Sequence, residues 1–210
     1  YNLGDRIYVT ANGLRGTNIG NLNINLICGN TSTNLLKISG RAFSTEEDQS
    51  YSIPYKIITK DDLEVSDLTT LIGTCQISAG LGSDVTTTKV FTITDDIILE
   101  ANINKMNYKP GEGITLKVLA TKANGNLLNG FLRVDGAATL EKAVIDGVAQ
   151  ETFSMPDTTE AGEYNINLSV YDTDEIGEKL NQKNFVIPFT IDPIAALIET
   201  SLSNVEIIPG

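Results

Sequence analysis

Carboxylate pairs are the side chains of this sequence that come closest to a catalytic arrangement. Asp61 and Asp62 are adjacent, and Asp172 and Asp174 are separated by one residue. A glycoside hydrolase needs only two carboxylates, one of which donates the proton. Asp residues in short polar stretches are more often turn residues, because their side chains hydrogen-bond to the nearby backbone. We therefore expect these pairs to shape turns, and we expect the chain not to be an enzyme.

Other common catalytic and phosphate-binding arrangements are missing from the sequence. The chain contains no histidine, which excludes Ser-His-Asp and Cys-His nucleophiles and zinc sites with histidine ligands. It also lacks a G-x-x-x-x-G-K-[ST] segment and a G-x-G-x-x-G segment after a predicted strand, so the common phosphate-binding loops are absent. A formal net charge of −12 argues against nucleic acid as a partner. No apolar run reaches the roughly 20 residues that a membrane-spanning helix needs.

One group of acidic residues is a weak candidate for a cation site. Asp95, Asp96 and Glu100 are close together in the sequence, and Glu112 follows them. Calcium prefers carboxylate oxygens, and an ion here could stiffen a hinge between domains. The chain has no D-x-D-x-D-G loop, however. We therefore expect no cofactor, with calcium bound by these four carboxylates as the alternative.

The elements that must position such residues are β-strands. Apolar and polar residues alternate in "LNINLIC", "GITLKVLA" and "GEYNINLSVYD", so one face of each strand is buried and the other is exposed to water. Asn-Gly and Asp-Gly pairs interrupt these runs at short intervals, as hairpin turns do. The pattern predicts an all-β fold made of antiparallel sandwiches.

An internal repeat divides the chain. The segment "YKPGEGITLKV" begins at Tyr108, "YNLGDRIYV" begins at Tyr1, and "IIPG" ends at Gly210. Gly4 and Gly111 are 111 − 4 = 107 residues apart, and Gly111 and Gly210 are 210 − 111 = 99 apart. The repeat predicts one domain over residues 1–95, a second over residues 96–192, and the start of a further repeat over residues 193–210.

The second unit contains a Tyr-x-Pro-Gly-Glu turn with alternating apolar residues after it, an NG-x-L-x-x-G step and an AGEY segment before a strand. These motifs consist of Tyr108, Pro110, Gly111, Glu112, Ile114, Leu116, Asn124, Gly125, Leu127, Gly130, Ala161, Gly162, Glu163 and Tyr164. In them the unit resembles the macroglobulin-type and related immunoglobulin-like β-sandwich repeats of archaeal and bacterial cell-surface proteins. The first unit departs from the pattern, with Leu3 in place of the Pro and Asp5 in place of the Glu. Nothing in the chain matches the Cys-Gly-Glu-Gln thioester of family members that trap proteases. The resemblance implies two tandem immunoglobulin-like sandwiches in an extracellular protein.

Two kinds of covalent modification are predicted. Cys28 and Cys75 both fall at inward positions of the first unit, where they either form a disulfide or remain two buried thiols. We favour the disulfide, because the resemblance places the chain outside the cell. Asn30 and Asn167 each begin an N-x-[ST] triplet at a position expected to be exposed, and are candidate glycosylation sites.

These observations predict a structural or adhesive role at the cell surface, in a surface layer, an adhesin stalk or a filament. The alternatives are a module that binds a glycan or a protein, and accessory domains of a large secreted enzyme. Because the chain opens at Tyr1 without a methionine, we expect a processed product or a piece of a longer protein.

The first unit lacks a counterpart of "IILEANINKMN", the strand that precedes the motif in the second unit, and the C-terminal segment resembles that strand. Either the array continues within a longer chain, or the segment of one subunit fills the open edge of the next. The partners are thus adjoining repeats or further copies of the chain. The residues predicted to form the assembly strand are Ile194, Leu197, Ile198, Leu202, Val205 and Ile207.

Overall fold

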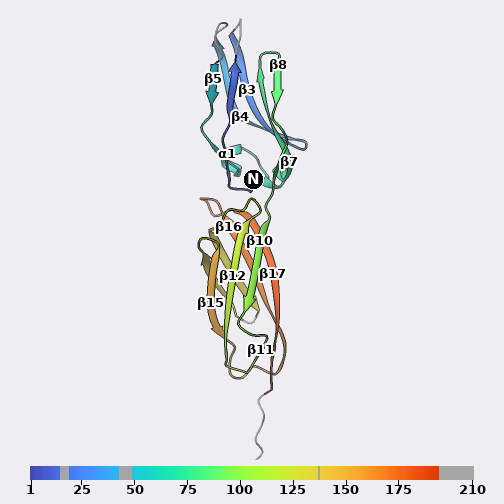
Figure 1. The fold of residues 1–210 in the computed structure, drawn as a ribbon, viewed down its shortest axis with the longest axis vertical. Helices are drawn as coiled ribbons and strands as arrows, with labels where there is room; N and C mark the ends of the chain where they lie inside the picture. The colour runs from blue at the N-terminus through green and yellow to red at the C-terminus, as the bar shows by residue number, and fades with distance from the viewer. Residues whose placement is uncertain (15–18, 43–48, 137, 194–210) are drawn as a thin grey trace, which may run out of the picture.

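The structure is a computed structural model that describes residues 1–14, 19–42, 49–136 and 138–193, and it has an all-β sandwich fold. Figure 1 shows an elongated molecule in which two groups of sheets are stacked end to end. We call residues 1–95 the N-terminal half and residues 96–193 the C-terminal half. The start of the chain lies between the halves, whereas the last described residues lie at the far tip of the C-terminal half.

The N-terminal half contains a larger sheet with the strand order β4-β3-β7-β8, in which β9 also pairs with β7. Two small sheets, β1-β6 and β2-β5, form the opposite layer. One helical turn and one 3-10 turn connect β6 to β7. The elements are β1 (Arg6–Ile7), β2 (Thr10–Leu14), β3 (Ile19–Cys28), β4 (Thr31–Ala42), β5 (Gln49–Ser52), β6 (Lys56–Ile57), α1 (Lys60–Leu63), η1 (Leu68–Leu71), β7 (Gly73–Leu81), β8 (Asp84–Thr87) and β9 (Phe91–Ile93).

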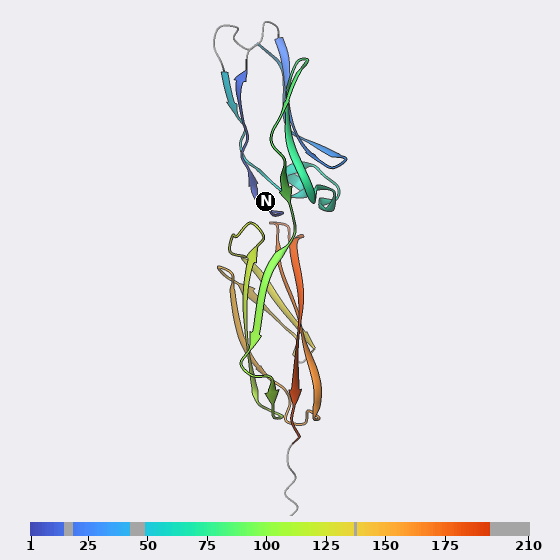
Figure 2. The ribbon, with the colours of Figure 1, turned by 45° about the vertical axis from the view of Figure 1, so that its right-hand side comes forward.

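The C-terminal half consists of a three-stranded sheet, β10-β12-β15, and a five-stranded sheet, β11-β17-β16-β13-β14. All pairs are antiparallel except β11 with β17. Figure 2 shows the two layers of this half from a second angle. The elements are β10 (Ile97–Ile103), β11 (Asn107–Tyr108), β12 (Gly113–Lys122), β13 (Gly130–Gly136), β14 (Leu140–Val144), β15 (Val148–Ser154), β16 (Gly162–Thr173) and β17 (Lys179–Ile191).

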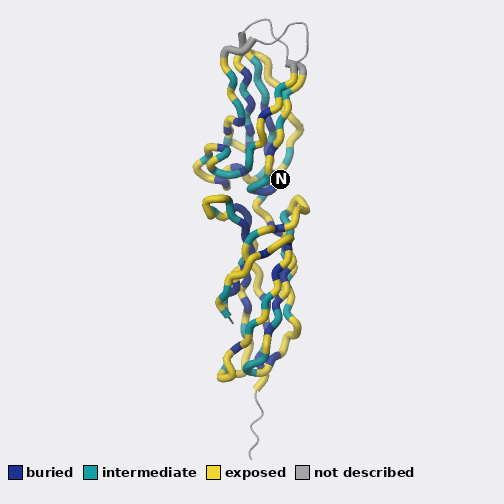
Figure 3. Tube along the Cα trace, turned by 90° about the vertical axis from the view of Figure 1, so that its left-hand side faces the viewer, coloured by how far each residue is buried: buried dark blue, intermediate teal, exposed yellow. Residues whose placement is uncertain are grey.

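Each half has its own apolar core. In β12, Ile114, Leu116 and Val118 are fully buried between the layers, as the period-two alternation predicts. Burying a side chain of this size contributes about 1.5–3 kcal/mol to folding. Figure 3 shows buried and exposed residues alternating along the strands of both halves. The N-terminal core, built around Leu22, Ile24 and neighbours, includes one residue of the C-terminal half, Leu180.

The repeated motif makes the same turn in both halves. Gly111 adopts a φ of 79° and Gly4 a φ of 82°, a region that side chains other than glycine rarely enter. The Glu112 carboxylate accepts a hydrogen bond from the backbone N–H of Lys109 at 2.6 Å, and the Asp5 carboxylate accepts one from Asn2 at 2.6 Å. In the first copy of the motif, Asp5 therefore makes the backbone contact that Glu112 makes in the second copy.

The strand pairing also repeats, with one difference. β1 and β2 pair with β6 and β5 as β12 pairs with β15. The parallel bridge between Asn2 and Thr94 corresponds to the pairing of β11 with β17. In the C-terminal half β12 has a second neighbour, β10, whereas β2 pairs with β5 alone among the residues that the structure describes.

Candidate functional site

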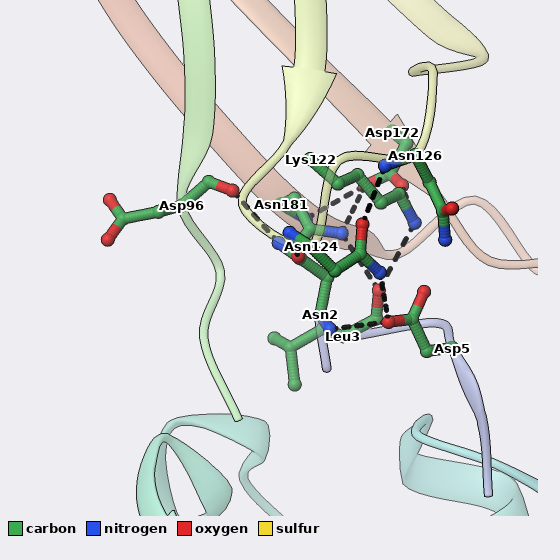
Figure 4. A network of polar contacts seen from close by, with 9 residues as sticks. All are labelled: Asn2, Leu3, Asp5, Asp96, Lys122, Asn124, Asn126, Asp172 and Asn181. Carbon is green, nitrogen blue, oxygen red and sulfur yellow. Dashed lines mark hydrogen bonds and ion pairs between the residues drawn. The ribbon is translucent and has the colours of Figure 1, made fainter. Parts of the chain in front are cut away.

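The densest set of polar side chains lies where the two halves meet (Figure 4). Four segments contribute to it: the start of the chain before β1, the connection between β9 and β10, the end of β12 with the loop after it, and the strand ends on either side of the β16–β17 turn. We call this set the junction. Its members are Asn2, Leu3, Asp5, Asp96, Lys122, Asn124, Asp172 and Asn181.

Two fully buried carboxamides form the centre of the junction. Asn2 and Asn181 are both 0% exposed. Asn2 donates from Nδ2 to the backbone oxygen of Asp96 at 2.8 Å and to Oδ1 of Asn181 at 3.1 Å. Its own Oδ1 accepts from the backbone N–H of Asn124 at 3.1 Å. An unpaired buried amide would cost about 1–3 kcal/mol, so these bonds hold the two halves in one relative position.

A buried ion pair lies beside the carboxamides. Lys122 Nζ is 2.8 Å from Asp172 Oδ2, and the two side chains are only 14% and 7% exposed. The other carboxylate oxygen of Asp172 accepts from the backbone N–H and the Nδ2 of Asn181. The backbone oxygen of Leu3 accepts from Asn181 at 2.9 Å and from Lys122 at 3.4 Å. The charge pair is therefore oriented by neutral partners from both halves.

Further contacts extend the junction to the surface. Asn124 donates from Nδ2 to the Asp5 carboxylate at 2.6 Å, and Lys60 forms an ion pair with Glu178. Leu180 packs into the N-terminal core, where a Cβ on Gly4 would lie 2.8 Å from its Cδ1. Among the described residues, every buried side-chain nitrogen and oxygen has a hydrogen-bond partner. The junction thus combines a satisfied polar network with an apolar anchor, which is the chemistry of a fixed coupling between the two halves.

An aromatic hollow lies next to the junction, and residues of both halves line it. It is lined by residues such as Tyr1, Tyr8 and Asn126. Tyr8 is 68% exposed, and its ring centroid lies 5.9 Å from that of Tyr55, over which the Arg6 guanidinium is placed at 4.5 Å. Exposed tyrosines beside amides can stack on a flat apolar face and donate hydrogen bonds.

A groove opens on the side of the N-terminal half, between strand β8 and the edge of β2 that pairs with no other strand of the described residues. Its volume is about 510 Å³, and core residues form its floor. All four residues of β8 are exposed, and Val85 is 68% exposed. Its lining includes Val9 and Ala11 from the β2 side, and Leu22, Ile77, Ala79 and Val85 from the opposite sheet.

The predicted disulfide is confirmed. Cys28 and Cys75 are joined, and they lie directly opposite each other on the neighbouring strands β3 and β7. The bond closes a separation of 47 residues, which corresponds to about 4 kcal/mol in the chain-entropy account. Both cysteines belong to the N-terminal core.

The grouping of the four acidic residues is wrong in one respect, because Glu112 is not at the hinge. Asp96 lies where β10 begins, and its backbone oxygen accepts from Ala123. Glu112 lies at the other end of the antiparallel β10–β12 pair, 2.5 Å from Lys105. Hydrogen bonds from Lys105 and from the Lys109 backbone lower the pKa of Glu112, so this carboxylate serves the turn.

Asp95, Asp96 and Glu100 are exposed, and no group of three or more candidate metal ligands occurs in the described part of the chain. Asn30 and Asn167 are both exposed, and their glycosylation stays a prediction. The assembly-strand residues Ile194, Leu197, Ile198, Leu202, Val205 and Ile207 lie outside the described residues.

Apart from Asp96, which was grouped with the candidate calcium ligands, the junction residues were not singled out as a site by their sequence pattern. Asp172 was noticed only as a turn carboxylate. A signal exists, because Asp172 is a buried charged residue that follows the inward series Leu168 and Val170 on the same strand. A polar residue at an inward position needs partners, but the sequence does not say that they lie near residues 2 and 122.

No family model and no curated protein matches this chain. In the regions that the structure describes, no helix is long and apolar enough to cross a membrane.

Proposed function

We propose that this chain is a structural module of an extracellular surface protein, in which two β-sandwiches act together as a stiff spacer in a surface layer, an adhesin stalk or a filament. The observation that carries the proposal is the junction, in which the fully buried carboxamides of Asn2 and Asn181 bond across the boundary of the halves. The buried ion pair lies beside them in the C-terminal half, and its Lys122 also donates to the backbone oxygen of Leu3. A spacer needs such a coupling, because domains joined only by a linker reorient freely.

Two further features support this role. The disulfide is typical of proteins that mature in an oxidising compartment. The connection between β9 and β10 is only three residues, Thr94 to Asp96. The backbone oxygen of Thr94 accepts a hydrogen bond from the Leu3 backbone N–H, and that of Asp96 accepts one from the Asn2 side chain. The halves are therefore tied by a short connection as well as by side chains.

The experiment compares interdomain motion in the native chain and in Asn181→Ala. NMR residual dipolar couplings should fit one alignment tensor for both halves of the native chain and two different tensors for the variant. Asn165→Ala is the control, because Asn165 is exposed on β16, away from the junction. Two independent tensors in the native chain would contradict the proposal.

The aromatic hollow favours a second candidate, a module that binds a surface glycan. Tyr8, Tyr55 and Arg6 form an exposed group of neighbouring rings and a guanidinium beside the amides of the junction loop. Titration of glycans against the chain should give a saturable signal that Tyr8→Ala removes and Tyr51→Ala, on a partly buried ring outside the hollow, retains. Absence of saturable binding across a glycan array would exclude this candidate.

A further inference from the structure

The groove of the N-terminal half occupies the position that a strand fills in the C-terminal half. There, β10 pairs with β12 and lies alongside β17, so that it closes the gap between the two layers (Figure 1). β2 corresponds to β12 by the pairing described above. β8 and β9 correspond to β17, because they pair with β7 as β17 pairs with β16. The groove lies between β2 and β8, which is the place that β10 takes in the C-terminal half.

Residues of the β2 region are less buried than the residues of β12 that align with them in the repeat. Subtracting the repeat offset of 107 places Val9 opposite Leu116 and Ala11 opposite Val118 in the alignment of the two copies. Leu116 and Val118 are fully buried, whereas Val9 and Ala11 are only partly buried. An unpaired strand edge beside exposed apolar side chains is a template for another strand.

We propose that residues 194–210 of a second copy of this chain add to the edge of β2 and fill the groove. The proposal rests on the proposed structural function and names the partner that extends it into a filament. The segment matches β10 and the turn that follows at an offset of 99, so that Ile198, Leu202 and Ile207 take the places of Leu99, Ile103 and Tyr108. Those three residues face the C-terminal core.

The β10–β12 register predicts the register of the added strand. Ile103 lies opposite Leu116, and Ala101 lies opposite Val118, in an antiparallel pair. Applying the two offsets places Leu202 opposite Val9 and Thr200 opposite Ala11. Alternate residues then enter the groove, and Ser201 between them points away from it.

A second copy is required because the segment cannot reach the groove of its own chain. Its equivalent place in its own C-terminal half is already occupied by β10. β17 takes 13 residues to run from the junction to the far tip, where Ile191 lies. Of the 210 − 193 = 17 residues that follow, a fully extended return to the junction uses about 13, and the remainder is too short to line the groove beyond it.

Cysteine cross-linking of the full-length chain tests the register. Residues directly opposite in an antiparallel pair lie about 4.5–5.5 Å apart, within the range that a disulfide spans. A mixture of the Ala11→Cys and Thr200→Cys variants should form a disulfide-linked heterodimer on mild oxidation. The matched control is Ala11→Cys with Ser201→Cys, which should cross-link at least about tenfold less because Ser201 faces away. Equal cross-linking in both mixtures would overturn the proposal.

Self-association measured by sedimentation gives the second readout. Leu202→Asp should weaken association by at least about a hundredfold, because it places a carboxylate in the apolar groove. Ser201→Asp should leave association within about threefold of the native chain, since that side chain stays in water. A native chain that remains monomeric at millimolar concentration, or a Leu202→Asp variant that assembles normally, would overturn the strand addition.

The dipolar-coupling experiment on the junction is independent of these results. A monomeric chain with one alignment tensor would remove the strand addition and retain the stiff spacer. An assembling chain with two tensors would do the reverse.

Discussion

The two halves of this chain stabilise the same kind of β-sandwich in different ways. The C-terminal half closes its sandwich with β10 and contains no cysteine. The N-terminal half has the same turn and the same strand pairing around it, but its β2 edge borders a groove, and a disulfide joins its central strands. Among the described residues, the half whose sandwich borders a groove is thus also the half whose core contains a cross-link.

The largest effect is expected where the halves depend on each other. Asp172→Ala should lower the free energy of unfolding by about 3–5 kcal/mol, because it leaves the Lys122 ammonium buried without its partner. Calorimetry should show the loss together with a separation of the transitions of the two halves. Glu163→Ala, an exposed carboxylate on the same strand, is the control. Unchanged coupling of the transitions would mean that the ion pair contributes nothing to the junction.

The second prediction separates the halves. Replacing both cysteines by Ala, Cys28→Ala with Cys75→Ala, should destabilise the N-terminal half by about 2–5 kcal/mol, since the cross-link constrains its unfolded state. Amide hydrogen exchange should speed up in β3 and β7 and stay within about twofold in β12 and β16. Equal acceleration in both halves would show that they do not fold as distinct units.

The third prediction compares two equivalent core positions. Leu116→Ala should cost about 2–5 kcal/mol, because Leu116 is fully buried under β10. Val9→Ala should cost about 1 kcal/mol or less in the monomer, because Val9 borders the groove and already contacts water. Urea denaturation at low protein concentration measures both values. Equal costs would mean that the groove does not expose this part of the core.

The smallest effect concerns the repeated turn. Asp5→Asn and Glu112→Gln each weaken a charge-assisted bond to a backbone N–H. Each should lower the melting temperature by no more than about 3 °C, with the greater loss for Asp5, which also binds Asn124.

The pKa of Glu112 is lowered in the folded state, so its contribution is present above the unfolded value of 4.5 and is lost as the pH falls. The difference between native chain and Glu112→Gln should therefore vanish in acid. A difference that grows as the pH falls would contradict the assignment of the turn.

The strands and the disulfide could be predicted because they depend on local alternation. Leu26 and Cys28 face inward in the structure as the period of two requires, and Cys75 was placed inward by the repeat. The helical turn α1 was not predicted, because a cap by Thr59 stabilises only four residues. Glu112 was misplaced because closeness in sequence was taken for closeness in space, although an extended hairpin separates the residues at its ends.

The junction could not be predicted for a related reason. Asn2, Asn124 and Asn181 are ordinary polar residues in their local sequence, and each looks like a turn or strand-end residue. Their role depends on contacts between residues far apart in the sequence. Asn2 is 122 positions from Asn124 and 179 positions from Asn181. Such contacts follow from how the halves stack, which depends on the shapes of both folded units rather than on any local pattern.

The position of Leu180 has a consequence for synthesis of the chain on the ribosome. The N-terminal half ends near residue 95, but its core includes Leu180, and its first residues are bound by Asn181. At about 5–20 residues per second, the half must wait roughly 4–17 s for these residues to be made. During that interval the nascent half has neither its apolar anchor nor its polar partners, and its open edge is exposed to neighbouring chains on the same polysome. The order of translation thus sets an interval in which the N-terminal half lacks the contacts that Leu180 and Asn181 later supply.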